Sequence, residues 1–294
     1  MSQRALRWIC LTALLLALTG CSRVQFVYGQ LDWLVPFYLN TYVTLDDEQY
    51  AFLETEVARL LEWHCSAHLR DYAQLLREAD SDFQQGRVTP ERLISYTKRL
   101  ERYWLEILQQ ALPSIAELLH RATDEQIDEL FEVFEERNEE ARERLTESTP
   151  DELLEDYQER MTEELERWFG AVTPDQAERV VAWSERFQPL GEEGIAFRKG
   201  WQARLRGLLE DRSDVARLQT RLEALFGQTD DLRPPAYRAR LEHNRRVTVE
   251  LIADVAGTLT PEQLAHMAER IEGLAGDFEE LACEAEERSA DTAP

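Results

Sequence analysis

The chain has 294 residues, of which 44% are hydrophobic, and a formal net charge of −25. This hydrophobic fraction is too high for a disordered chain and allows a packed core. The strong negative charge excludes nucleic acid as a partner, because a phosphate backbone repels such a surface.

Residues 1–20 have the pattern of a secretory signal. Arg4 and Arg7 precede an apolar run from Ile9 to Leu18. This run is too short to cross a bilayer as a helix, which takes about 20 residues. A charged start, a short apolar run and small residues before a cleavage site are typical of a segment that directs export and is then removed.

The apolar run closes with Leu18-Thr19-Gly20-Cys21, which resembles the lipobox of bacterial lipoproteins. The resemblance implies that Cys21 becomes the acylated first residue of the mature chain and anchors it in a membrane. The next residue is Ser22 rather than an aspartate, which by the same resemblance favours transfer to the outer membrane, facing the periplasm. The alternative is an ordinary secreted protein in which Cys21 falls by chance.

Residues 21–43 form an apolar segment with no Ser/Gly-rich tether. Its only charged residues are Arg23 and Asp32, and Pro36 is expected to kink or split a helix here. The aromatic residues of the segment are Phe26, Tyr28, Trp33, Phe37, Tyr38 and Tyr42. Such a segment lies either in the membrane interface or in the core of the folded body. Because the basic face of an interfacial helix is missing, we expect the core.

Residues 44–294 are predicted to form an all-α domain, an irregular bundle of roughly eight to ten helices with short loops. Apolar residues recur with the helical period from Asp46 to about Glu78, and no alternating run is long enough for a strand. Later helix starts are marked by a threonine followed by proline or an acid. These threonines are Thr89, Thr123, Thr149, Thr173 and Thr260.

The recurring start has a simple physical basis. The threonine hydroxyl caps a free N–H, proline fits the first turn, and the acid faces the positive helix end. Gln or Glu three residues after the cap can reach back to it, a relation that Asp46 and Gln49 share. The unequal spacing of the starts argues against a solenoid of equal repeats. Pro113 is expected to interrupt or bend the helix that begins at Thr89.

Charge is unevenly distributed along the bundle. Residues 124–166 hold 19 acids and four arginines, whereas residues 198–221 and 233–246 are basic. Opposite charges on solvated helix faces can pair inside the fold, and we expect this arrangement. The other interpretation is a bipolar surface that binds a partner.

Two helix starts, Leu259-Thr260-Pro261-Glu262-Gln263 and Val172-Thr173-Pro174-Asp175-Gln176, resemble the Leu-Thr-x-x-Gln motif of small periplasmic helical chaperones. In that family the motif opens the helices of a cradle that shelters unfolded proteins. The motif is equally a good capping box, which explains it without any shared function.

The amino-terminal third resembles an uncharacterised family of Gram-negative lipoproteins, a domain of unknown function. The resemblance is carried by Tyr28, Leu31-Asp32-Trp33-Leu34, Tyr42, Leu45-Asp46, Gln49 and Trp63-His64. It implies a helical outer-membrane lipoprotein and brings no activity with it. The residues it marks as possible binding or structural positions are Tyr28, Asp32, Trp33, Tyr42, Trp63 and His64.

His64 and His68 lie four residues apart, a spacing that can place two imidazoles on one metal ion. Both sit on the apolar stripe of their helix, no third ligand is near in sequence, and the Glu of a His-Glu-x-x-His motif is absent. We therefore expect core or edge histidines rather than a metal site.

Four cysteines occur in the chain. By the resemblance to the lipobox, Cys10 is expected to leave with the signal and Cys21 to take the lipid. Cys65 and Cys283 remain, and in an oxidising compartment they are expected either to pair with each other or to be buried.

No catalytic motif or cofactor site emerges from the sequence, because a Gly-rich phosphate loop and a Gly-x-Ser-x-Gly elbow are both missing. The sequence favours a non-enzymatic lipoprotein that binds a periplasmic protein or lipid client in envelope maintenance. The alternative is a metal-binding protein or metalloenzyme centred on His64 and His68.

Overall fold

The computed structural model describes residues 23–283, and this part of the chain is all-α, as the sequence predicts. The predicted signal segment, Cys21 and Ser22 lie outside it. Twelve helices are described, more than the roughly eight to ten expected. They are α2 (Arg23–Tyr28), α3 (Leu31–Leu39), α4 (Asp47–Ala67), α5 (Leu69–Gln84), α6 (Pro90–Arg121), α7 (Asp124–Glu147), α8 (Pro150–Phe169), α9 (Pro174–Arg186), α10 (Gly191–Leu209), α11 (Val215–Gly227), α12 (Pro235–Ala256) and α13 (Pro261–Leu281).

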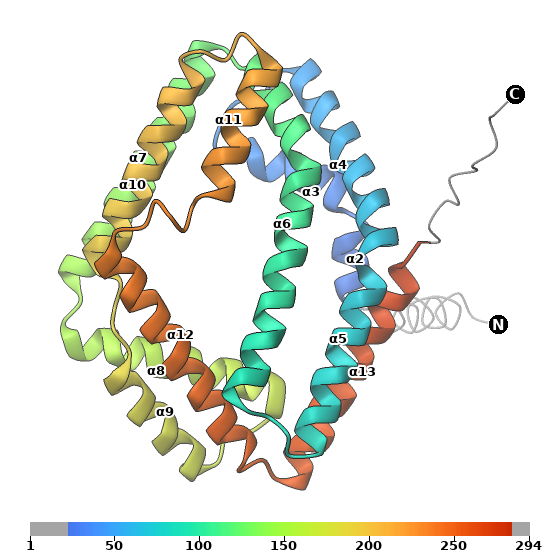
Figure 1. The fold of residues 1–294 in the computed structure, drawn as a ribbon, viewed down its shortest axis with the longest axis vertical. Helices are drawn as coiled ribbons and strands as arrows, with labels where there is room; N and C mark the ends of the chain where they lie inside the picture. Colours follow the sequence, from blue (N-terminus) through green and yellow to red (C-terminus); the bar gives the residue numbers. More distant parts are fainter. Residues whose placement is uncertain (1–22, 284–294) are drawn as a thin grey trace, which may run out of the picture.

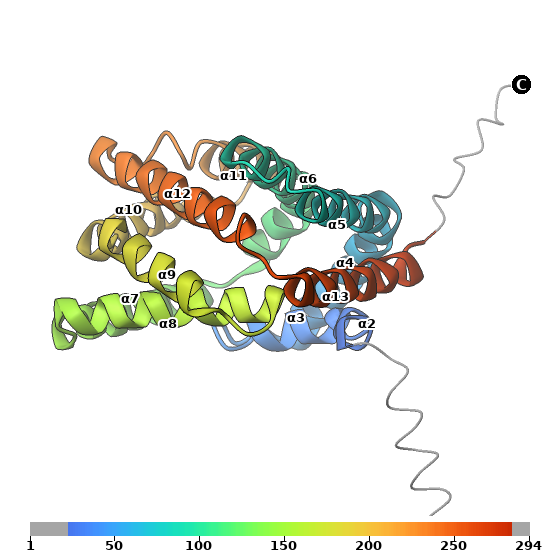
Figure 2. The ribbon, with the colours of Figure 1, turned by 90° about the horizontal axis from the view of Figure 1, so that it is seen from below.

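The helices form an irregular, layered arrangement rather than a regular bundle (Figure 1). Helix α6 runs through the middle, with α4, α5 and α13 along one side and the paired helices α7 and α10 along the other. Seen from below, α2 and α3 lie in the layer opposite α6 (Figure 2). Helix α4 packs against both α3 and α6 and so joins the two layers.

Two apolar cores hold this arrangement together. One lies among α6, α7, α10 and α11, where Leu112, Leu209, Leu218 and Leu222 are almost fully buried. The other lies among α8, α9, α12 and α13 and includes Trp183 and residues from all four helices. Each fully buried side chain of this kind stabilises the fold by about 1.5–3 kcal/mol, so these two cores dominate the packing energy.

The predicted helix starts are confirmed. Thr89, Thr123, Thr149, Thr173 and Thr260 all cap their helices through the side chain. The last four of them, and Asp46, form complete capping boxes with the residue three positions on.

The glutamines of four capping boxes also bond to one another across helices, in two pairs. Gln49 of α4 and Gln126 of α7 exchange two side-chain hydrogen bonds, at 2.9 and 2.6 Å. Gln176 of α9 and Gln263 of α13 do the same, at 2.9 Å in both directions. The glutamine of the Leu-Thr-x-x-Gln motif is therefore a buried structural residue here, because it caps its own helix and joins it to another.

One boundary differs from the sequence-based prediction, and of the two alternatives at Pro113 an interruption does not occur. The long helix expected from Asp46 to about Glu78 is divided at His68, whose backbone departs from helical geometry. Helix α6 continues through Pro113 without interruption, although proline lacks the N–H that would bond back to the preceding turn.

The acidic stretch pairs with the first basic stretch inside the fold, as expected, whereas Arg233, Arg240 and Arg245 of the second pair with acids outside residues 124–166. Acids of α7 face basic residues of α10 and of the loop after it. The pairs are Glu135 with Lys199, Asp128 with Arg206, and Asp124 with Arg212. Exposed pairs contribute at most about 1 kcal/mol each, but together they orient α7 against α10.

Cys65 and Cys283 form a disulfide, which confirms the pairing considered from the sequence. The bond joins α4 to the residues just after α13, and the backbone N–H of Cys283 donates to the carbonyl of Cys65 at 3.2 Å. Within the described residues, no helix is both long and apolar enough to cross a bilayer.

Candidate functional site

A chain of five polar side chains runs from the amino-terminal segment into the body. Tyr28 Oη lies 3.0 Å from His64 Nδ1, and His64 Nε2 lies 3.1 Å from Tyr72 Oη. Tyr72 Oη lies 3.4 Å from His68 Nδ1, and His68 Nε2 lies 2.8 Å from Glu106 Oε2. The chain brings α2, α4, α5 and α6 together, with His68 at the junction between α4 and α5. Each imidazole nitrogen has a hydrogen-bond partner, which indicates that the network stabilises the packing of these helices.

Burial shifts the pKa of three members of this network. It lowers the pKa of His64 to about 4, with a smaller contribution from neighbouring His68. It also raises the pKa of Tyr28 and of Tyr72 to about 12. His64 and the two tyrosines are therefore neutral near pH 7, and the pKa of His64 is too low for a general base that operates there.

The geometry does not support a metal centre at the two histidines. Both ring nitrogens of His64 have hydrogen-bond partners, and the described residues contain no group of three His, Cys, Asp or Glu that could hold an ion. The histidines instead pack against aromatic rings, with Trp63 4.9 Å and Tyr103 5.2 Å from His68 between ring centroids.

The residues singled out from the sequence do not form one site. Tyr28, Trp63 and His64 meet around the polar chain described above. Asp32 accepts from the backbone N–H of Trp33 in the first turn of α3. Tyr42 lies elsewhere, with its ring 6.3 Å from that of Phe134 and the Arg137 guanidinium 4.4 Å above it.

The expectation that the aromatic residues of the amino-terminal segment are buried is wrong for several of them. Helix α3 packs on α4 and α2 contacts α13, so the segment does lie against the body. However, Phe26, Trp33, Phe37 and Tyr38 are exposed, while Pro36 is buried. The apolar pattern correctly indicated packing, but a helix lying on a surface covers only one of its sides.

An apolar cavity of about 530 Å³ lies between α3, α4 and α6. Helix α3 contributes Val35 and Leu39, α4 contributes Leu60, and α6 contributes Ala111 and Ile115. Side chains of α7, α10 and α11 complete the wall. The volume falls within the range of about 300–1,000 Å³ that is usual for small-molecule sites.

Three polar side chains meet at the wall of this cavity. Ser114 donates to Glu56, and Arg59 donates to both, at 2.9 Å to Glu56 and 3.2 Å to Ser114. The Ser114 hydroxyl and then Arg59 hold the pKa of the Glu56 carboxyl below its usual value, against the effect of burial. The three groups satisfy one another, so the cavity offers hydrocarbon surface with little unpaired polarity.

A wider groove of about 890 Å³ lies between the α7–α8 turn and helices α10–α12. Its lining mixes aromatic residues such as Trp201 and Tyr237 with Arg144, Arg160 and Asp156. Because this lining is partly aromatic and partly charged, it favours no single class of ligand, whereas the apolar lining of the α3–α4–α6 cavity does.

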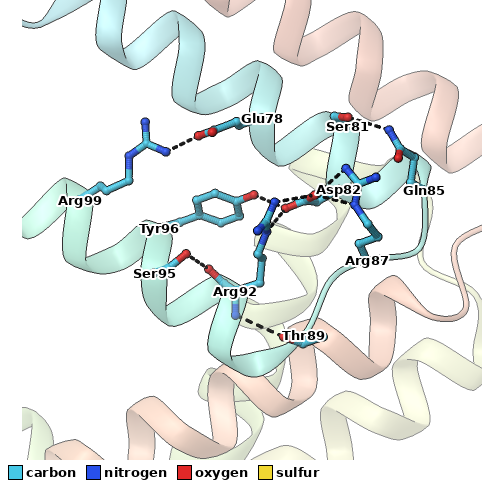
Figure 3. A network of polar contacts seen from close by, with 10 residues as sticks. All are labelled: Glu78, Ser81, Asp82, Gln85, Arg87, Thr89, Arg92, Ser95, Tyr96 and Arg99. Carbon is cyan, nitrogen blue, oxygen red and sulfur yellow. Dashed lines mark hydrogen bonds and ion pairs between the residues drawn. The ribbon is translucent and has the colours of Figure 1, made fainter.

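Figure 3 shows a second polar cluster, at the turn between α5 and α6. The Asp82 carboxylate is fully buried and accepts from Arg87, Arg92 and the Tyr96 hydroxyl. The guanidinium of Arg92, then Tyr96 and Arg87, hold the pKa of Asp82 far below its usual value. Because the buried carboxylate has three donors and the two guanidinium groups are about half exposed to solvent, the cluster fixes the turn rather than awaiting a ligand.

Sequence reasoning missed both the cavity and the Asp82 cluster. The cavity is lined by aliphatic residues on helical stripes, which carry the same sequence signal as a filled core. Asp82 is one acid among many, and its partners become visible only when the turn brings α5 and α6 together.

The fold and these sites define an all-helical protein with a large apolar cavity and internally satisfied polar clusters. Residues 41–238, more than half of the chain, match the model of the Family of unknown function (DUF6279), and the chain belongs to this family. Tyr28, Asp32 and Trp33 lie outside the matched range, although they were among the residues that suggested such a family. No curated protein and no solved structure matches the chain.

Proposed function

We propose that the mature protein is a non-enzymatic lipoprotein, held at the periplasmic face of the outer membrane by a lipid on Cys21. It binds the hydrocarbon chain of a lipid client in the cavity between α3, α4 and α6. The observation that carries the proposal is the cavity itself, with a volume of about 530 Å³ and an almost wholly apolar lining. Each methylene group moved from water into such a site contributes about 0.8 kcal/mol.

A lipid chain fits the lining better than a polypeptide does. A peptide brings N–H and C=O groups that lose free energy when they are buried without hydrogen-bond partners. The helices that line the cavity use their own backbone groups internally, and the polar groups of Glu56, Arg59 and Ser114 already bond to one another. A hydrocarbon chain has no polar groups that need hydrogen-bond partners when it is buried.

The disulfide supports placement outside the cytoplasm. Bonds of this kind persist in oxidising compartments such as the bacterial periplasm. The Cys65–Cys283 bond therefore agrees with the signal segment and lipobox pattern at residues 1–21. The metal-dependent alternative lacks a group of ligands among the described residues.

Binding of a fluorescent fatty acid to the full-length mature protein tests the cavity. Ala111→Trp places a large side chain in the cavity, and we expect it to weaken binding at least tenfold, or about 1.4 kcal/mol. Ala182→Trp, at an exposed position of α9, is the matched control and should bind like the wild type. Thermal melting of each variant verifies the fold, and Ala111→Leu gives a smaller change if the larger one disrupts it.

Two results would contradict the proposal. No binding by the wild type would exclude a lipid client, and equal binding by all variants would place the ligand elsewhere. The anchor is tested separately, because the wild type should incorporate labelled palmitate and Cys21→Ala should not.

A further inference from the structure

The outer side of α2 and α3 carries an uncovered group of large apolar side chains, which we call the α2–α3 face. It consists of Phe26, Val27, Trp33 and Phe37, which are 67%, 48%, 44% and 60% exposed. The rings of Trp33 and Phe37 meet edge to face, with their centroids 6.1 Å apart. Contiguous apolar surface of this kind on a folded protein marks a contact site.

The α2–α3 face is held rigidly outward. Elsewhere on the two helices, Pro36 is buried, and Tyr28 bonds to His64 and to the carbonyl of Leu61. Gln25 donates to Asp277 and Glu280 of α13. These contacts fix the orientation of α2 and α3, so the exposed rings cannot turn inward without breaking them.

We infer that the α2–α3 face rests in the interfacial region of the lipid bilayer. This inference depends on the proposed anchor at Cys21. Covalent geometry limits the reach of the chain to about 3.3–3.6 Å per residue, so a lipid on Cys21 keeps the start of α2 within about 7 Å of the anchored residue. The apolar side chains nearest the anchor are therefore the ones that meet the membrane first.

The composition of the face suits a bilayer interface. Tryptophan and other aromatic residues concentrate at this depth, where an apolar ring and a polar edge can both be accommodated. Arg23 and Asp32 are the only charged residues between positions 23 and 43. A face with so little charge matches zwitterionic headgroups and does not depend on anionic lipid.

The distribution of charge bears on the kind of lipid that the face meets. The most acidic helix, α7, lies in the same layer as α2 and α3 (Figure 2), and its Glu129 bonds to Thr44 just after α3. Because the acids of α7 repel anionic lipid, the face suits a zwitterionic surface. With the α2–α3 face on the bilayer, α3 lies between the bilayer and the apolar cavity, because Val35 and Leu39 on its inner side line the cavity.

Fluorescence quenching by brominated lipids tests the inference. The acylated full-length mature protein is incorporated into phosphatidylethanolamine vesicles that contain phosphatidylcholine brominated on its acyl chains. We expect the brominated lipid to quench part of the tryptophan emission, and Trp33→Phe to remove at least half of that quenched fraction. Trp104→Phe is the matched control, since Trp104 is 62% exposed on α6, in the layer opposite α2 and α3 (Figure 2). It should leave the quenched fraction unchanged.

The possible outcomes separate the two proposals. Failure of the wild type to float with vesicles contradicts the anchor and, with it, membrane docking. Flotation with equal quenching in the wild type and Trp33→Phe overturns the docking face alone and leaves the anchor intact. Loss of the quenched fraction in Trp104→Phe instead would place α6 against the membrane and equally overturn the inference.

Discussion

Asp82 carries a negative charge with no exposed surface, which is tolerable only because three donors surround it. Arg87 and Arg92 come from the loop and the first turn of α6, so the carboxylate orders the connection between α5 and α6. The arginines are themselves about half exposed, which limits the cost of losing the carboxylate, because they can regain water.

Replacing Asp82 with asparagine should lower the free energy of unfolding by about 1–3 kcal/mol, since the amide keeps the shape but loses the charge. Urea denaturation, read as the midpoint and slope, measures the change. Glu78→Gln is the control: the Glu78–Arg99 pair lies close by, but its carboxylate is about half exposed (Figure 3). It should cost less than about 1 kcal/mol. An equal decrease in the free energy of unfolding in the two variants would mean that the burial of Asp82 does not increase the stabilising effect of its ion pairs.

The lowered pKa of Asp82 also predicts how the contribution of this group to stability changes with pH. Because the folded-state pKa is lowered, the contribution of this group is present above its unfolded pKa of about 3.9. It disappears as the pH falls from there through the folded-state pKa, since the unfolded chain then binds the proton more readily.

At the scale of the helices, the capping boxes separate features that neighbouring residues determine from features that depend on tertiary packing. The cap, the proline and the glutamine lie within four residues, so their sequence predicts each helix start. The cross-helix pairing of Gln176 with Gln263, and of Gln49 with Gln126, was not predictable, because it depends on which helix starts meet in space.

The glutamine pairs should couple the helices that they join. Gln176→Ala and Gln263→Ala each remove the side-chain acceptor for the N–H of their own cap residue and leave the partner amide buried without its hydrogen bonds, so we expect about 2 kcal/mol of destabilisation apiece. A double-mutant cycle should show a coupling of about 1–2 kcal/mol.

The control for this cycle is Glu152→Ala. Glu152 occupies the same box position in α8 but is exposed and bonds to Thr149 of its own cap. Its loss should cost only about 1 kcal/mol, the usual value of a helix cap. A coupling near zero in the cycle would show that the two helix starts are stabilised independently.

On the scale of the whole molecule, the amino-terminal helices are tied to the last one. The disulfide joins Cys65 to Cys283, and Arg77 of α5 pairs with Glu272 and Glu279 of α13. The sequence identified the two cysteines that could pair, since no others remained. It could not identify the helices that they would join, because this contact spans 218 residues.

The double variant Cys65→Ser/Cys283→Ser should lower the free energy of unfolding by about 2–5 kcal/mol, because the closed loop restricts the unfolded chain. Denaturation of the oxidised wild type and of the variant measures the difference. A reducing agent should shift the wild type toward the variant and leave the variant itself unchanged. A wild type insensitive to reduction would mean that the bond adds no stability.

The overall class and the helix starts were predictable because periodicity and capping act over a few residues. The exposed side of α2–α3 and the cavity were not. Trp33 and Leu60 are both apolar residues on helical stripes, yet one faces outward and the other lines the cavity. Only the packing of complete helices decides which apolar surface remains uncovered.

The position of α13 has a consequence for incomplete chains. Leu76 and Phe83 of α5 pack against a core that includes Met267 and Ile271 of α13, and Gln84 donates to the carbonyl of Leu264, 180 residues later. During synthesis, α5 therefore stays partly uncovered until nearly the whole chain has been made. A polypeptide that ends before α13 would leave this surface of α5 exposed and would remain a substrate for proteases. Protease resistance of this protein therefore depends on the synthesis of α13.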